Sequence, residues 1–355
     1  MQQNRNYATL ATLWNDYTAM PRQLAWRAQT LAAWTTWRSA LQTKLIARLG
    51  GLPTERPPLD SLVLETTELD DYRQEKVAFQ SEPGIYTPCY VLTPRHVKPP
   101  YRPVIALHGH GMGGAAHVIG LTRGTTTQQA EIDHIAAHNY DYGRQLAQRG
   151  FMVFAMEQRG FGERMEPQPG MISGSELWQS SCRALAFNTL LLGKTLLGLR
   201  VWDVMRTIDY IHSRPEPMIN GVGCVGLSGG GTTTLFAAAV EPRITVPILS
   251  GAFGSFRSSI MSTIHCDCNY VPGILQDAEM ADIAALIAPR PLLIENGTED
   301  PIFPVAETEA ACREVAKAYA LLGAPERFDQ DIFVGGHQFS GKKAFDWFDQ
   351  WLVES

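Results

Sequence analysis

Short apolar runs alternate with helical patterns from about residue 100 to the end of the chain, and this alternation constrains the fold more than any other feature. Glycine, proline or polar residues flank each run, as expected for buried strands. The alternation predicts a doubly wound, mostly parallel sheet with helices on both faces. The predicted strands are PVIALHG (103–109), FMVFAME (151–157), GVGCVGL (221–227), TVPILSG (245–251), RPLLIENG (290–297) and FDQDIFV (328–334). The predicted helices lie near 138–149, 176–213, 231–240, 305–322 and 341–353.

The first part of the chain has a different pattern. Residues 1–58 are predicted to form a helical extension and a proline-containing linker, because leucine and tryptophan recur at helical spacing before a pair of glycines. Three short strand-like runs in residues 61–94, two of them joined by a Pro-Gly turn, predict an antiparallel meander. We therefore expect an extension at 1–58 and a main domain at 59–355. The tryptophans of the extension favour a cap over the main domain; a contact in a homo-oligomer is the alternative.

Composition excludes some partners. The 355 residues carry 36 acidic side chains against 30 of Lys and Arg, a formal net charge of −6, without a Lys/Arg-rich block. This balance argues against nucleic acid or an anionic membrane as the partner. We see neither a secretory signal pattern nor an apolar run of about 18 residues, so we expect a cytoplasmic protein without a membrane span. The six cysteines are expected to be reduced, because a chain of this length needs no disulfides.

The segment Gly226-Leu227-Ser228-Gly229-Gly230 fits the pattern G-x-S-x-G between a predicted strand and a predicted helix. A turn this tight holds the serine at strained backbone angles, and small neighbours permit the close approach of helix and strand. The hydroxyl then projects beside a helix N-terminus, which favours developing negative charge. We expect Ser228 to be a nucleophile; an incidental serine in a glycine-rich turn is the alternative.

An acid and a histidine follow in the order that α/β hydrolases require. Asp300 comes after the predicted strand at 290–297, and His337 comes after the strand at 328–334. Both positions are carboxyl ends of strands, where sites in open α/β sheets collect. A serine hydroxyl needs an imidazole to take its proton, and the imidazole needs a carboxylate to orient it. The order therefore predicts a catalytic triad and an α/β-hydrolase fold, with Glu299 as the less favoured rival of Asp300.

An oxyanion hole needs two backbone N–H groups. We expect one from Gly229, after the nucleophile, and the other from His110, in the loop His108-Gly109-His110-Gly111 that follows an early strand. The two histidines could instead suggest a metal site, but no carboxylate cluster lies nearby. The pair Cys266 and Cys268 has no second Cys/His pair at zinc spacing. We expect neither a metal nor a cofactor.

Four further side chains are candidates for a substrate pocket: Arg159, Trp178, Tyr270 and Phe303. For Arg159, an ion pair that anchors its loop is the favoured alternative, and for the other three plain packing is an equal one. The run GVGCVG at 221–226 spells G-x-G-x-x-G, but its residues form the predicted strand itself, so a dinucleotide site is not expected.

Several motifs together resemble a known group of proteins. They are the HGHG loop, EQRGFGER (157–164), GLSGGG, HCDCNYVPGIL (265–275), ALIAPRPLLIENGTEDPIFP (285–304) and VGGHQF. In combination they resemble the dienelactone-hydrolase-like and acetyl xylan esterase-like families of bacterial α/β hydrolases, over residues 60–355. Dienelactone hydrolases proper have cysteine at the position of Ser228, and acetyl esterases often have glutamine at the position of Gly229. The resemblance implies deacetylation of a sugar ester.

These features predict a serine hydrolase that acts on a small or carbohydrate-linked ester through an acyl-enzyme intermediate. A peptidase related to the prolyl peptidases is one alternative, although the N-terminal segment is too short for a gating propeller. A non-catalytic binding module on the same fold is the other.

Overall fold

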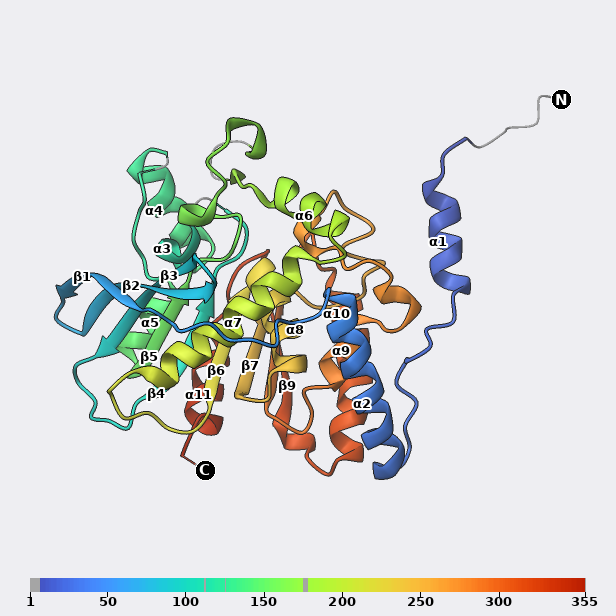
Figure 1. Ribbon diagram of the computed structural model, residues 1–355. Helices are drawn as coiled ribbons and strands as arrows, with labels where there is room; N and C mark the ends of the chain where they lie inside the picture. Colours follow the sequence, from blue (N-terminus) through green and yellow to red (C-terminus); the bar gives the residue numbers. More distant parts are fainter. Residues whose placement is uncertain (1–6, 112, 125, 175–177, 355) are drawn as a thin grey trace.

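The computed structural model describes residues 7–111, 113–124, 126–174 and 178–354. At its centre lies one sheet with the strand order β1-β2-β3-β5-β4-β6-β7-β8-β9 (Figure 1). The strands are β1 (Leu62–Glu68), β2 (Tyr72–Glu82), β3 (Ile85–Pro94), β4 (Arg102–Leu107), β5 (Phe151–Met156), β6 (Val222–Leu227), β7 (Ile244–Ser250), β8 (Leu292–Gly297) and β9 (Phe328–Phe333). Pairing is antiparallel from β1 through β3 to β5 and parallel from β5 to β9, in agreement with the predicted meander and parallel sheet.

Helices cover both faces of this sheet. Along β4, Ile105 and Leu107 enter one hydrophobic cluster, while Val104 and Ala106 enter the other, because successive side chains of a strand point to opposite faces. Helices α2, α7, α8, α9 and α10 pack into the first cluster, and α3, α5 and α11 into the second. The helices are α1 (Leu10–Ala19), α2 (Leu31–Arg48), α3 (Gly114–Val118), α4 (Gln128–Ala137), α5 (Tyr142–Gln148), α6 (Cys182–Leu191), α7 (Leu196–Ser213), α8 (Gly229–Val240), α9 (Met280–Ala285), α10 (Val305–Leu321) and α11 (Ala344–Trp351), with short 3-10 turns at Gly162–Arg164, Pro169–Met171, Asp267–Asn269, Ile274–Gln276 and Pro325–Arg327.

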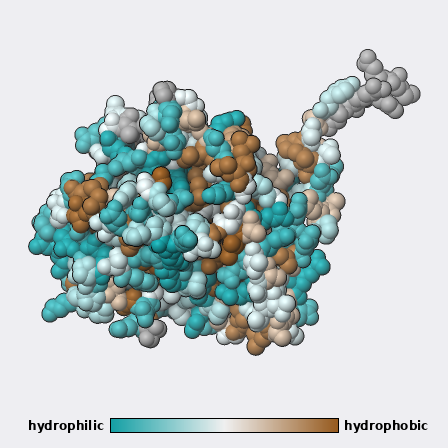
Figure 2. All heavy atoms as spheres, viewed as in Figure 1, coloured by the Kyte–Doolittle hydropathy of each residue, from teal (hydrophilic) through white to brown (hydrophobic). Residues whose placement is uncertain are grey.

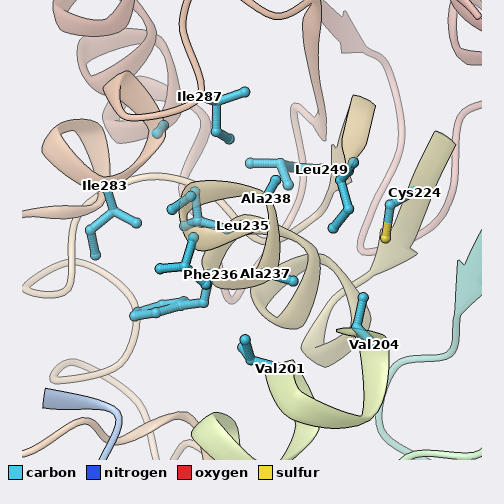
Figure 3. Close-up of a cluster of buried hydrophobic side chains, with 14 of the residues drawn as sticks. Val201, Val204, Cys224, Leu235, Phe236, Ala237, Ala238, Leu249, Ile283 and Ile287 are labelled. Atoms are coloured by element: carbon cyan, nitrogen blue, oxygen red, sulfur yellow. The ribbon is translucent and has the colours of Figure 1, made fainter. Parts of the chain in front are cut away.

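Helix α8 lies in the middle of the larger cluster. Figure 3 shows Leu235 and Phe236 of α8 among Val204 of α7, Leu249 of β7 and Ile283 of α9. Every residue of α8 is buried. Burial of a side chain such as Leu235 contributes about 1.5–3 kcal/mol. The packing therefore fixes the helix that begins directly after Ser228.

The N-terminal segment packs on the flank of the main domain. Helix α2 buries Trp34, Leu41 and Leu45, and its Arg48 forms an ion pair with Asp277 at 2.6 Å, whereas α1 buries no side chain. Within residues 7–58, no side chain lines the cavity beside Ser228. The N-terminal segment thus covers the flank of the main domain rather than the cavity beside Ser228, because the apolar face of α2 packs on α8 and its neighbours.

The segment before β6 differs from the prediction. Instead of one helix at 176–213 there are two, α6 and α7, because the chain turns at Gly193, with φ of +69°, and Thr195 caps α7 by accepting the N–H of Gly198 at 2.9 Å. Among the described residues no single helix could cross a membrane; α6 and α7 meet the requirement only jointly, across a bend of 101°. Figure 2 shows a hydrophobic patch over α6, where Phe187 and Leu191 are exposed.

The edge strand β1 is exposed along nearly its whole length. Leu62, Val63 and Leu64 are each more than half exposed, and the pairing of β1 with β2 is irregular between Val63 and Glu65. The sheet thus ends in an exposed, bulged strand on this side.

Candidate active site

Ser228 stands at the sharp turn from β6 into α8. Its φ of 57° and ψ of −120° are strained for a residue with a side chain, and its N–H donates to Ser250 O at 2.8 Å. A Cβ on Gly226 would lie 2.3 Å from the carbonyl carbon of Gly230, and one on Gly230 would lie 2.1 Å from Leu107 O. The glycines of the pentapeptide are therefore required by close approach, as predicted.

Asp300 and His337 come together from the ends of β8 and β9. The imidazole Nδ1 lies 2.7 Å from Asp300 Oδ2. Asp300 is buried, and its Oδ1 accepts the N–H groups of Ile302 and Phe303 at 2.8 and 3.0 Å. Glu299 is exposed instead. Of the two acidic candidates, it is Asp300 that orients the ring.

The ring of His337 lies over the end of β7, next to the turn that carries Ser228. A Cβ on Gly251 would be 3.2 Å from the ring, so glycine makes room for the imidazole there. Ser228 and His337 line the same cavity of about 210 Å³. No hydrogen bond joins these two described side chains, a common situation before substrate binds.

The two predicted oxyanion donors lie beside this cavity. Among the described residues, the N–H groups of His110 and Gly229 have no acceptor, whereas the N–H of Gly109 donates to Tyr140 Oη at 2.7 Å. The His110 ring packs so closely on Gly229 that a Cβ there would lie 2.6 Å from its Cε1. The neighbouring His108 is fully buried, and its Nε2 accepts the N–H of Gln158 at 2.9 Å, which ties the two loops together.

Of the four predicted pocket residues, only Trp178 lines the cavity. Arg159 does not, because Asp203 binds its Nε and Nη2 at 2.8 Å each and Glu82 binds it too. Phe303 is buried behind His337, with its ring stacked at a centroid distance of 6.2 Å. The Tyr270 hydroxyl donates to Ile260 O at 2.9 Å, on a different surface. The pocket role is thus corrected for these three residues.

Sequence reasoning missed the other histidines of the cavity wall. His134 and His138 lie there with ring centroids 4.3 Å apart, and His265 lines the cavity near His110. Burial, reinforced by the neighbouring histidines, lowers the pKa of both His134 and His265 to about 4. These rings are neutral near pH 7. The helical spacing of His134 and His138 was visible in the sequence, but their position in the same cavity wall as Ser228 was not.

Sequence reasoning also missed a cluster that could hold a metal. Cys266 Sγ lies 3.1 Å from Cys268 Sγ, which lies 3.2 Å from Nε2 of His110. These three residues are the group of potential metal ligands that the described part of the chain brings together. The short spacing of the two cysteines was visible in the sequence, whereas the contact with a histidine 158 residues away from Cys268 was not.

The sequence matches a known protein family over most of its length. The model of the Abhydrolase family matches residues 20–339. The chain belongs to the Abhydrolase family. This membership confirms the predicted fold class and the resemblance to esterase-like α/β hydrolases.

Three relatives of this Abhydrolase protein are informative. YtaP of Bacillus subtilis (strain 168), provisionally assigned as a hydrolase, is 25% identical over 305 residues, which cover 84% of this chain and 94% of YtaP. A 4-O-methyl-glucuronoyl methylesterase of Schizophyllum commune is 32% identical over 165 residues, 38% of this chain and 41% of that protein. A Bacteroides fragilis protein, provisionally assigned as an acetyl xylan esterase, has a crystal structure with a TM-score of 0.75, 16% identity and coverage of 94% of this chain and 84% of that chain, which shows the shared fold.

Proposed function

We propose that this Abhydrolase protein is a serine esterase in which Ser228 is the nucleophile, His337 the general base and Asp300 the orienting acid. One observation carries the proposal. A serine at strained backbone angles on a strand-to-helix turn shares a cavity with an imidazole whose Nδ1 is held by a buried carboxylate. A turn with an incidental serine would not require the His337 imidazole or the Asp300 carboxylate.

The reaction follows from which atoms are already engaged. Because Asp300 occupies Nδ1 of His337, the Nε2 lone pair is left to take the proton of the Ser228 hydroxyl. The serine oxygen attacks the ester carbonyl, and the N–H groups of His110 and Gly229 bind the oxyanion. His337 then protonates the leaving alcohol. Water, activated by the same imidazole, cleaves the acyl-enzyme and restores Ser228.

The cavity favours a small, neutral ester. Its described wall carries histidine, aromatic, aliphatic and small polar side chains but no Lys, Arg, Asp or Glu, so it offers no fixed charge to an ionic substrate. A volume of about 210 Å³ is below the roughly 300–1,000 Å³ usual for drug-sized ligands. We infer that the reacting end is a short acyl or alkyl ester. The methylesterase and acetyl xylan esterase relatives support a carbohydrate as the rest of the substrate.

Replacement of the nucleophile tests the proposal. We expect Ser228→Ala to abolish hydrolysis of p-nitrophenyl acetate and labelling by a fluorophosphonate, while the thermal unfolding midpoint stays near that of the wild type. Ser262→Ala, at an exposed serine outside the cavity, is the matched control and should keep both activities. Wild-type turnover by Ser228→Ala would exclude the mechanism. Absence of labelling in the wild type would favour a binding module, and peptide cleavage faster than ester cleavage would favour a peptidase.

A further inference from the structure

Three cysteines and a histidine from distant parts of the chain meet beneath the proposed active site. Cys266 precedes the 3-10 turn Asp267–Asn269 and Cys268 lies within it, His110 comes from the loop after β4, and Cys182 begins α6. Besides the distances of 3.1 and 3.2 Å given above, Cys182 Sγ accepts an N–H of Arg200 at 3.0 Å and lies beside this group of three ligand atoms. Cys182 and Cys268 are almost fully buried.

A buried cation beside the cluster lacks an acidic partner. Arg200 is 1% exposed, and its guanidinium donates to Arg159 O at 2.6 Å and to Cys182 Sγ at 3.0 Å and lies over the Phe161 ring. None of the described carboxylates forms an ion pair with it. A buried charge normally requires an opposite charge close by, and the nearest groups able to carry one are the sulfurs.

We propose that Cys182, Cys266 and Cys268, as thiolates, and Nε2 of His110 bind one zinc ion. Soft thiolates with an imidazole are a preferred ligand set of Zn²⁺, with Zn–S distances of about 2.3 Å and Zn–N distances of about 2.0–2.1 Å. Tetrahedral ligands at these lengths lie about 3.4–3.8 Å apart, so the ligand atoms of His110, Cys266 and Cys268 need to move outward by roughly half an ångström. Cys182 Sγ lies outside the group of ligand atoms that are within 4.8 Å of one another, so it needs to approach them. Three thiolates, one divalent cation and the Arg200 guanidinium together are electrically neutral.

The proposed ion is structural, because four protein ligands close the coordination shell. It joins the start of α6 to the loop after β4 and to the segment that carries His265, and the last two border the cavity. The metal site does not depend on the esterase assignment. Only its effect on the His110 N–H rests on the proposed function, since the ligated ring fixes the main chain that carries that donor.

Metal analysis of the full-length protein tests the site. The protein is produced with zinc in the medium, desalted into metal-free buffer and analysed by plasma mass spectrometry, with an expected content of about one zinc per chain. Cys268→Ser should lose the metal. Cys312→Ser, at a buried cysteine in α10 outside the cluster, should retain it. Replacement by cobalt should give the intense d–d and thiolate-to-cobalt absorption of tetrahedral thiolate coordination.

Two results would overturn the proposal, and neither needs a variant to fold. One is wild-type protein that keeps less than about a tenth of an equivalent of zinc and, after chelation and cobalt addition, shows no tetrahedral spectrum. The other is a thiol titration of denatured, chelated protein that finds four free thiols rather than all six, since that would reveal a disulfide in place of a metal. Because these readouts are independent of turnover, an inactive esterase with bound zinc would contradict the function and not the metal site.

Discussion

Ser228 illustrates how far a local pattern determines a residue's role. The pentapeptide around it permits one kind of turn, since a Cβ on Gly226 or Gly230 would collide with backbone. The strain at Ser228, of order 1–3 kcal/mol, persists because the buried helix α8 holds the turn in place. A local sequence pattern was sufficient to predict this geometry because the pattern of small residues around the serine already specifies the turn, although Leu107 of β4 and Ser250 of β7 also contact it.

Asp300 offers a test with a built-in control. Asp300→Asn keeps an oxygen for the N–H groups of Ile302 and Phe303 but no longer stabilises the His337 imidazolium. We expect kcat on p-nitrophenyl acetate to fall by about 10³–10⁴ with the fold intact. Glu299→Gln, next in the chain and exposed, should stay within about twofold of the wild type. Equal losses in the two variants would contradict the role of Asp300.

Contacts between residues that are distant in the sequence could be predicted only where the fold class determines them. The order Ser228, Asp300, His337 could be predicted because the fold class fixes which strand ends carry these groups. The histidines of the cavity wall and the ligand cluster around His110 could not, since no periodicity relates Cys268 to a side chain 158 positions away. The favoured interpretation of Arg159, an ion pair that anchors its loop, is confirmed, but its partner Asp203 on α7 could not be predicted for the same reason.

At the scale of elements, α7 is held to the loop after β5 by a buried ion-pair network. Asp203 binds both Arg159 and Arg164, with the Arg164 Nη1 at 2.7 Å. Burial alone would raise the pKa of Asp203, but the two guanidinium groups outweigh it and lower the pKa to about 2. The carboxylate is therefore charged near neutral pH, and it links α7 to the loop after β5.

Removal of this charge should be costly. We expect Asp203→Asn to lower the free energy of unfolding by about 3–5 kcal/mol, because the buried Arg164 loses its ion-pair partner and Arg159 keeps only Glu82. Urea denaturation measures the change. Glu314→Gln, in an exposed ion pair with Lys317, should alter stability by less than about 0.5 kcal/mol. A loss below about 1 kcal/mol in Asp203→Asn would show that the network is not stabilising.

Element boundaries were predicted well where strands and covering helices alternate. They were predicted less well in the segments between β4 and β5 and between β5 and β6. The break between α6 and α7 depends on one glycine turn inside a run that is apolar on both sides. Helices α3 and α4 lie in a segment rich in glycine, threonine and histidine, which gives no clear helical period. Tertiary packing, rather than intrinsic preference, decides the structure of such short helices.

At the scale of the whole molecule, Glu295 couples the sheet to the loop that carries His337. It is fully buried in β8, and its carboxyl oxygens accept the N–H groups of Ser340 and Gly341 at 3.0 and 3.4 Å. Burial raises the pKa of Glu295 to about 7, against an ordinary value of 4.5. The folded state therefore holds a proton that the unfolded chain releases near pH 4.5.

This coupling predicts the sign of a pH effect. The stabilisation from protonated Glu295 is complete below about pH 4.5 and is lost as the pH rises through about 7, with a loss of up to about 3 kcal/mol. Glu295→Gln should lack this loss, so its thermal unfolding midpoint should gain on that of the wild type between pH 5 and pH 8. Glu299→Gln is the matched control. Parallel profiles for Glu295→Gln and the wild type would disprove the coupling.

The bulged edge strand β1 has a consequence for solutions of the protein at high concentration. A flat, apolar outer strand would present a row of free backbone groups on which a second molecule could build a continuous sheet. The irregularity between Val63 and Glu65 interrupts that row, and the exposed carboxylate of Glu65 adds a charge that repels the same group of another copy. The molecule can therefore expose three aliphatic side chains at this rim without offering a template for fibril growth.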